Sequence, residues 1–318
     1  MEKIKLEPGI YPGMVSDDYF KVDAVNNSLL WLLKEQSPKH VKHVLDNPPR
    51  PTDALRIGKA FHTRILEPEK FDAENIVIPS FTLNTNAGKE AFTEHVLQLR
   101  DDDVIDALDA EDMIEAKKGK RDMLMDAVAK SGMAILEQHE LDCLNAMYSE
   151  LKKQPAHQYV VGGLAELVIV WEDEETGILM KAKLDYVKGD ECVIADVKSS
   201  MAGDFANASP VKYSRAISNY GLYQQAAVYT DGWQTLTGDV CSFLFIVCEK
   251  DAPWCTVPYE LGEPSIMAGR ASYRLALQTY KDCVAKDEWP GYNDGKVALI
   301  DAMVYTLRDE GIGPGVMI

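Results

Sequence analysis

The chain has 318 residues, 46% of them hydrophobic, so it can bury the core of one large domain or two smaller ones. Its formal net charge of −18 excludes a protein that coats nucleic acid non-specifically, because such proteins are usually basic. An enzyme that confines nucleic acid to one positively lined channel stays compatible with this charge. The sequence has no apolar run of membrane-spanning length and no signal-peptide layout, so we expect a cytoplasmic protein without membrane contact.

The first half of the chain predicts mainly helices. Residues 26–36 follow an Asn/Ser cap, and residues 37–47 start a second helix with Ser37 as cap and Pro38 at its first position. A third helix ends before Pro68, and two more lie within about 112–153. The acidic run at 100–116 is typical of a solvated helical face or loop.

The second half of the chain changes to strands near Gly162. Five segments have the alternating or continuous apolar pattern of strands: 164–172, 178–187, 192–200, 240–250 and 255–261. Helices are predicted over about 211–231 and about 264–287. This order predicts an α/β or α+β fold with a central mixed β-sheet flanked by helices, preceded by an N-terminal helical region.

Two full charges interrupt the third predicted strand, at Asp196 and Lys198. Their spacing of two places both side chains on one face of the strand. A short turn brings Asp185 of the preceding strand alongside, and the strand before that carries Glu166. A single Asp–Lys pair at a strand end is more often surface decoration, but acids on three neighbouring strands favour a functional site.

Acids that converge in this way repel one another, and a divalent cation is the natural partner that keeps them ionised. Hard carboxylate ligands favour Mg²⁺, with Mn²⁺ as a substitute. Lys198 would then orient a water molecule or stabilise charge on a phosphate. The six cysteines include no C-x-x-C pair, and the spacing of Cys241, Cys248 and Cys255 matches no cluster motif, so we expect no iron–sulfur cluster.

A helical segment after the acidic strand fits the same site. Gly221, Gln225 and Tyr229 recur every four residues and share one helix face. Gln225 and Tyr229 could contact a phosphate or the substrate strand from there. The alternative is an amphipathic helix whose tyrosines, Tyr220 among them, belong to the core.

A histidine on the third predicted helix is a further candidate. His62 follows Gly58 by four residues, and a glycine inside a helix costs about 1 kcal/mol relative to alanine. That cost indicates the close approach of another group at Gly58. A lone helical histidine is otherwise more often a core residue than a ligand.

The order of these residues, Glu, then Asp, then D-x-K, then a Gln/Tyr helix, resembles the PD-(D/E)xK nuclease superfamily. Four flanking segments resemble the exonuclease VIII (RecE-type) C-terminal nuclease family: SLLWLLKEQSPKHVKH, GKAFHTRILEPEKF, NYGLYQQAAVYTDGW and EWPGY. The likeness covers nearly the whole chain except about 75–125. It implies a restriction-endonuclease-like core in a single nuclease domain over 1–318. Within it, 1–160 is the mainly helical part that carries His62, and 161–318 is the catalytic α/β core.

The resemblance also implies residue roles. Metal ligands fall at four positions: His62, Asp185, Asp196 and the backbone carbonyl of Val197. Glu166 would bind a second metal or orient water, Lys198 would activate the water, and DNA contacts fall on three residues: Gln225, Tyr229 and Tyr220. The chain departs from the family in carrying Asp196 at the D/E-x-K position, which the pattern permits, and Tyr19–Phe20 where a Tyr-His pair is common.

The activity implied is Mg²⁺-dependent 5′–3′ digestion of linear double-stranded DNA, which leaves 3′ single-stranded tails for recombination. The implied partners are double-stranded DNA, a RecT-like single-strand annealing protein and further copies of the chain in a ring, in a phage or prophage setting within a bacterial cytoplasm. Two alternatives stay open: a RecB-like or Cas4-like nuclease that acts on single strands or flaps, and a non-catalytic DNA-binding or assembly protein.

Overall fold

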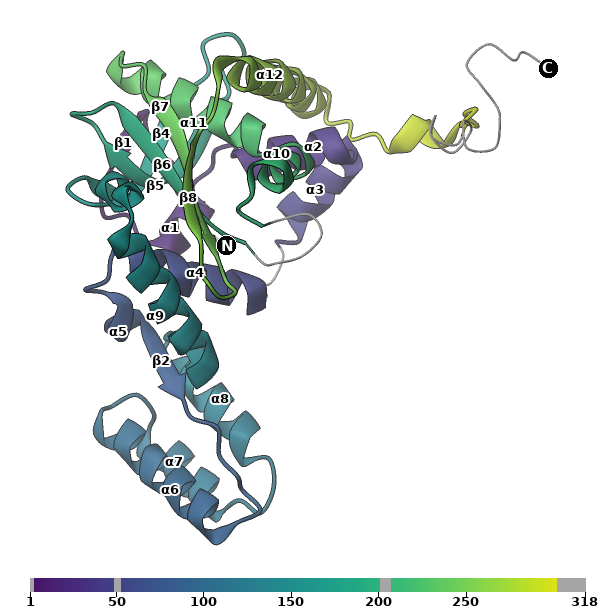
Figure 1. Cartoon of the computed structure of the whole chain (residues 1–318). Helices are drawn as coiled ribbons and strands as arrows, with labels where there is room; N and C mark the ends of the chain where they lie inside the picture. The colour runs from purple at the N-terminus through teal and green to yellow at the C-terminus, as the bar shows by residue number, and fades with distance from the viewer. Residues whose placement is uncertain (1–2, 49–52, 201–206, 302–318) are drawn as a thin grey trace.

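A six-stranded mixed sheet forms the centre of the computed structural model, which describes residues 3–48, 53–200 and 207–301 (Figure 1). Its strands, in spatial order, are β1 (Gly9–Tyr11), β4 (Leu164–Glu172), β5 (Leu179–Lys188), β6 (Val193–Ser200), β7 (Ser242–Glu249) and β8 (Thr256–Glu260). Neighbours are antiparallel except β6 and β7, which are parallel. The predicted mixed sheet flanked by helices is confirmed.

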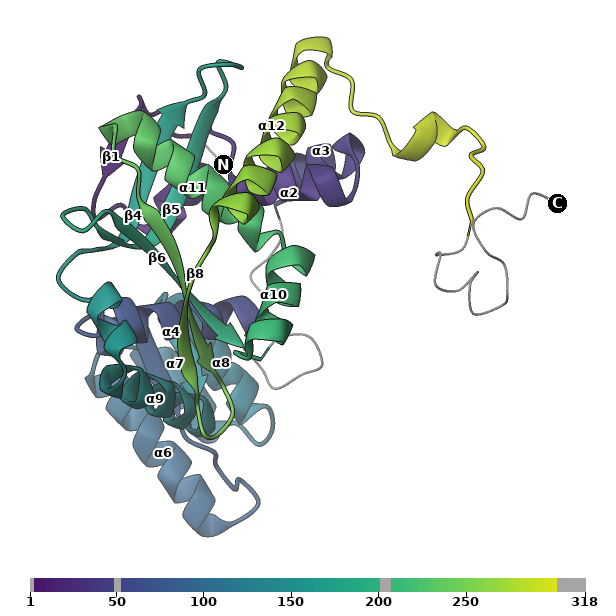
Figure 2. The same cartoon turned by 45° about the horizontal axis from the view of Figure 1, so that its top comes forward.

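Helices cover both faces of this sheet, as Figures 1 and 2 show from two directions. One face packs against α2 (Asn27–Glu35), α3 (Pro38–Asp46), α10 (Pro210–Asn219), α11 (Leu222–Thr237) and α12 (Glu263–Lys286). The other face packs against α4 (Asp53–Leu66), α9 (Gln138–Lys153) and the 3-10 helix η1 (Pro155–Val160). Each face has its own buried apolar cluster, so a side chain's direction on a strand decides which helices it meets.

Residues 3–25 form a hook along the sheet edge that carries β1 and the short helix α1 (Ser16–Lys21). Tyr19 and Val22 pack against the strand β4. The buried Lys181 of β5 donates hydrogen bonds to the main-chain carbonyls of Tyr19 at 2.8 Å and Val22 at 2.7 Å. These bonds satisfy carbonyls at the end of α1 and fasten the hook to the sheet.

Residues 71–137 form an elongated lobe that projects away from the sheet (Figure 1). It contains α5 (Phe71–Glu74), β2 (Asn75–Ile78), α6 (Asn86–Asp101), α7 (Ala107–Glu115), α8 (Lys120–Lys130) and β3 (Ala134–Glu137), with β2 and β3 parallel. A separate apolar cluster stabilises the helices α6–α8. The acidic run at 100–116 lies here: Ala110 and Met113 of α7 face the cluster while most of its carboxylates face solvent.

The chain after α12 returns to the N-terminal helices. The Trp289 ring packs edge-on against Tyr280 at 5.7 Å, and the Lys39 amide donates to the Pro290 carbonyl at 3.0 Å. The 3-10 helix η2 (Tyr292–Gly295) follows. Within the ranges that the structure describes, none of the helices has the length and apolar character needed to cross a membrane.

The prediction of one helix over 211–231 is wrong, because Gly221 divides it into α10 and α11. Gly221 has φ of +64°, and a Cβ at this position would overlap the indole ring of Trp31. Two features therefore require glycine at position 221: the left-handed backbone and the close approach of α2.

Replacing Gly221 with alanine should lower the free energy of unfolding by about 3 kcal/mol, since the left-handed penalty and the overlap with Trp31 add. Gly238, at the other end of α11, is the matched control: its φ is +82°, but a Cβ there would meet nothing within 4 Å. Gly238→Ala should therefore cost about 1 kcal/mol. Urea unfolding followed by circular dichroism measures both, and equal losses would contradict the role given to Trp31.

Candidate active site

The site begins where the strands β5 and β6 separate. They pair at only three positions, Tyr186↔Ala195, Val187↔Ile194 and Lys188↔Val193. The next pair in this register is Asp185 and Asp196, and there the ladder stops. The Asp185 Oδ2 atom accepts a hydrogen bond from the Val197 amide at 2.8 Å, in place of a strand carbonyl. The fork therefore places two buried carboxylates at its opening.

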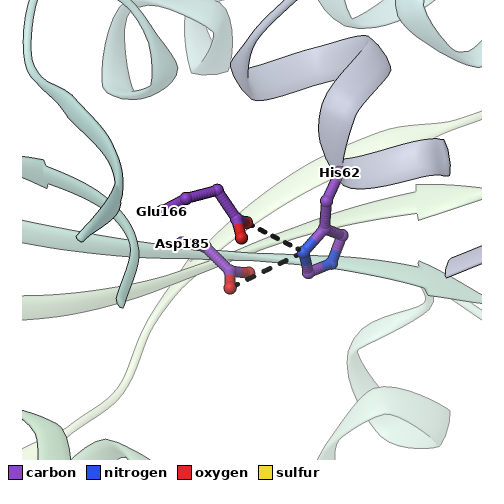
Figure 3. Close-up of side chains that lie close together, drawn as sticks. All are labelled: His62, Glu166 and Asp185. Atoms are coloured by element: carbon purple, nitrogen blue, oxygen red, sulfur yellow. Dashed lines mark ion pairs between the residues drawn. The ribbon is translucent and has the colours of Figure 1, made fainter. Parts of the chain in front are cut away.

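Helix α4 brings His62 to this fork, where it meets Asp185 and Glu166 (Figure 3). The His62 Nδ1 atom lies 3.6 Å from Glu166 Oε1 and 3.7 Å from Asp185 Oδ1. One ligand atom from each residue falls within 4.8 Å of the others. His62 Nε2 lies 3.1 Å from the Val197 carbonyl, which can only accept, so Nε2–H donates and Nδ1 faces the carboxylates.

Glu166 has an irregular backbone within the strand β4. Its φ is +50°, a left-handed conformation that costs a non-glycine residue about 1–2 kcal/mol. Ala165 packs against the apolar cluster on the α4 face, whereas Leu167 belongs to the cluster on the α11 face. The strand thus changes face at Glu166, which stands opposite Asp185 in the register. Glu166 therefore places backbone strain at the site itself.

Asp196 is held by a second set of partners. Its Oδ1 atom accepts a hydrogen bond from Gln225 Nε2 of α11 at 2.6 Å, and its Oδ2 atom lies 2.5 Å from Lys198 Nζ. The Asp196 side chain is 1% exposed, so both partners compensate a charge that water does not reach. Among the described residues, the close group is therefore His62, Glu166 and Asp185, with Asp196 beside it rather than within it.

The three close groups have divergent affinities for protons. Burial raises the pKa of Asp185 to about 6, and the nearby Asp196 carboxylate adds to this effect. Burial also opposes ionisation of Glu166, but His62 and Lys183 hold its pKa at about 2. Burial alone would lower the pKa of His62, whereas the Asp185 and Glu166 carboxylates raise it. Asp185 is thus the carboxylate that most needs a further cation.

The donor set fits a divalent cation. Glu166 Oε1 is buried and makes no hydrogen bond to any described residue, although it points at His62 and Asp185. Two carboxylate oxygens and one imidazole nitrogen suit Mn²⁺, and the hard oxygens also suit Mg²⁺. The Val197 carbonyl, predicted to be a further ligand, accepts the hydrogen bond from His62 Nε2 at 3.1 Å.

The two tyrosines predicted to contact DNA have different surroundings. The Tyr229 ring packs against the Phe243 ring, with 6.2 Å between the ring centroids, and burial raises the pKa of Tyr229 well above the usual value. Tyr220 ends the helix α10 with 58% of its surface exposed. Of the three predicted contact residues, Gln225 is the one that touches an acid of the fork.

Lys183 was missed by sequence reasoning, although it touches the site. Its Nζ pairs with Glu166 Oε2 and donates to Ser16 Oγ at 3.1 Å. The sequence could have indicated Lys183, because it lies two residues before Asp185 and so shares its face of the strand. The pairing with Glu166 required the register of β4 and β5, which the sequence pattern does not supply.

Comparison with known proteins identifies the family and the fold of the chain. The family model described as a PDDEXK-like domain of unknown function (DUF3799) matches residues 30–302, so the chain belongs to this family and to the PD-(D/E)xK nuclease superfamily. A crystal structure from Eubacterium rectale, described as a "putative exonuclease", matches with a TM-score of 0.55 and 12% sequence identity over 92% of this chain and 97% of that chain. This likeness shows the fold. No curated protein matches the sequence.

Divalent cations should stabilise the protein more at pH 7.5 than at pH 5. In the metal-free protein, the stability that protonated Asp185 contributes is present below about pH 4 and is lost as the pH rises through about 6. Below that pH a cation must displace the proton, so it binds less tightly.

Thermal unfolding with and without Mn²⁺ at the two pH values measures this difference. Asp185→Asn should lose the Mn²⁺ response, whereas the exposed Asp190→Ala, in the turn between β5 and β6, should keep it. An equal rise in Tm at both pH values, or a response that survives Asp185→Asn, would contradict the metal site.

Proposed function

We propose that the protein is a divalent-metal-dependent deoxyribonuclease that digests linear double-stranded DNA from its ends. The observation that carries the proposal is the fork of β5 and β6, where His62, Glu166 and Asp185 converge next to the Asp196–Lys198 pair. Family membership supports the nuclease class. Buried charges without a catalytic or binding role would be costly to keep, which disfavours a purely architectural protein.

His62, Glu166 and Asp185 would hold the cation, Mg²⁺ or Mn²⁺. When bound, it lowers the pKa of a water molecule and neutralises charge on the phosphate under attack. Lys198 pairs with Asp196 beside this group, and its ammonium would orient the attacking water and stabilise the developing negative charge. Gln225 fixes the other oxygen of Asp196, so the Asp196–Lys198 pair presents its ammonium in one direction.

The finer parts of the proposal are supported by the resemblance to the exonuclease VIII family. They are 5′–3′ polarity, production of 3′ tails, a single-strand annealing partner and a ring-like assembly of several copies. A ring with a positive interior would reconcile DNA handling with the net charge of −18.

Digestion of end-labelled linear duplex with Mg²⁺ tests the proposal, with 5′ and 3′ labels compared in parallel. Early release of the 5′ label is expected, and early release of the 3′ label would contradict the polarity. Cleavage confined to single strands or flaps would favour a RecB-like or Cas4-like activity. DNA binding without any cleavage in Mg²⁺ or Mn²⁺ would favour the alternative of a non-catalytic DNA-binding protein.

Asp196→Ala and Lys198→Ala should each lower the rate of duplex digestion by about 10³-fold, because each removes part of the group that acts on the phosphate and its water. Circular dichroism should show folded protein in both variants. Asp190→Ala, at the far end of the same two strands, should digest DNA at the wild-type rate. Wild-type activity in Asp196→Ala or Lys198→Ala would contradict the proposed mechanism.

Gly58 marks the surface over which the substrate would pass. It lies one turn before His62 on α4, and a Cβ there would meet no other described segment of the chain within 4 Å. The close approach expected at Gly58 is thus not made by the described protein residues. We propose that the DNA backbone occupies this space.

Gly58→Leu should lower kcat/KM for duplex DNA by about 10²-fold, since it displaces the phosphate from the site. Gly58→Ala should raise the free energy of unfolding by about 1 kcal/mol and impair digestion less. Thermal unfolding and steady-state digestion measure both effects. Wild-type digestion by the folded Gly58→Leu protein would show that the substrate does not pass over this face.

A further inference from the structure

Lys183 contacts the site without belonging to the group that would hold a cation. Its Nζ forms an ion pair with Glu166 Oε2 and donates a hydrogen bond to Ser16 Oγ at 3.1 Å. The Lys183 and Glu166 side chains are 24% and 19% exposed. A pair this sheltered restrains its members more than a surface salt bridge does.

The contact with Lys183 leaves one Glu166 oxygen free. Oε2 is occupied by Lys183, whereas Oε1 has no hydrogen-bond partner among the described residues and lies 3.6 Å from His62 Nδ1. A glutamate side chain has several rotatable bonds, and the carboxylate can turn unless one oxygen is fixed. The left-handed backbone of Glu166 adds strain that a second restraint has to balance.

The N-terminal hook in turn restrains the side chain of Lys183. Ser16 is the first residue of the helix α1. The end of that helix is held by the buried Lys181, which lies two residues before Lys183 on β5. Lys181 and Lys183 are two residues apart on β5, so both side chains point to the same face of the sheet, toward the hook. The hook is thereby connected to the metal-binding group through one serine and one lysine.

We infer that Lys183 is a positioning residue, which fixes Glu166 Oε2 so that Oε1 faces the cation site, and that Ser16 keeps Lys183 in place. The inference rests on the proposed metal-dependent function of this site and adds a residue to it. Coulomb's law alone gives the opposite expectation: a cation removed from the neighbourhood of a metal site should make the metal bind more tightly. The direction of the change in affinity therefore separates positioning from simple charge compensation.

The experiment is a calorimetric titration of metal-free, DNA-free protein with MnCl₂. Lys183→Met keeps the length of the side chain without its charge, and it should weaken Mn²⁺ binding about 10-fold. Lys183→Arg should stay near the wild-type affinity, because it restores the ion pair. Ser16→Ala changes no charge and should give a smaller loss in the same direction. If Lys183→Met does not fold, the Mn²⁺ affinity of Ser16→Ala tests the inference in its place.

The matched control is Lys188→Met, which removes a lysine from the end of the same strand, where it pairs with Glu191 at 2.6 Å. It should leave Mn²⁺ affinity unchanged. Unchanged or tighter binding by folded Lys183→Met, or no Mn²⁺ binding by the wild-type protein, would overturn the inference. Because no DNA is present, a loss of affinity supports it even if the wild-type protein proves unable to cleave DNA.

Discussion

The mutual repulsion of Asp185, Glu166 and Asp196 at the fork is the constraint on which the site depends. Two of these carboxylates have cations of their own, since Lys183 pairs with Glu166 and Lys198 pairs with Asp196. Asp185 accepts a hydrogen bond from a main-chain amide and lies 3.7 Å from His62, which compensates its charge only when the imidazole is protonated. Burial raises its pKa to about 6, the nearby carboxylates add to this effect, and a bound divalent cation would favour the ionised form. The lysines and His62 therefore offset much of the negative charge, and the proposed cation would offset the rest.

The sheet makes this arrangement possible because it stops pairing at the right place. β6 continues alongside β7 for its whole length, whereas β5 leaves it after three pairs, so a gap opens inside a well-packed core. Helices reach the gap from both faces, α4 with His62 and α11 with Gln225. The break at Gly221 lets α11 begin in contact with α2, four residues before Gln225. The elongated lobe of α6–α8 has an apolar cluster of its own.

Much of the fold and part of the site followed from local pattern. The period of two on β6 placed Asp196 and Lys198 on one face, and the short turn before it placed Asp185 at the fork. The grouping of His62 with them came from the resemblance, because α4 lies far away in the chain and packs on the face of the sheet opposite to α11. Lys183 could not be recognised without the β4–β5 register. The strands β2 and β3 are four residues each and pair across the intervening helices, so no local pattern marked them.

The central claim is that one cation is bound between His62 Nδ1, Glu166 Oε1 and Asp185 Oδ1. Anomalous diffraction from crystals soaked in MnCl₂, recorded at the manganese absorption edge, tests it most directly. The account predicts a strong peak within bonding distance of these three atoms, absent from crystals of the Asp185→Asn protein. A peak held by other residues alone, or none at Mn²⁺ concentrations that support DNA cleavage, would contradict it.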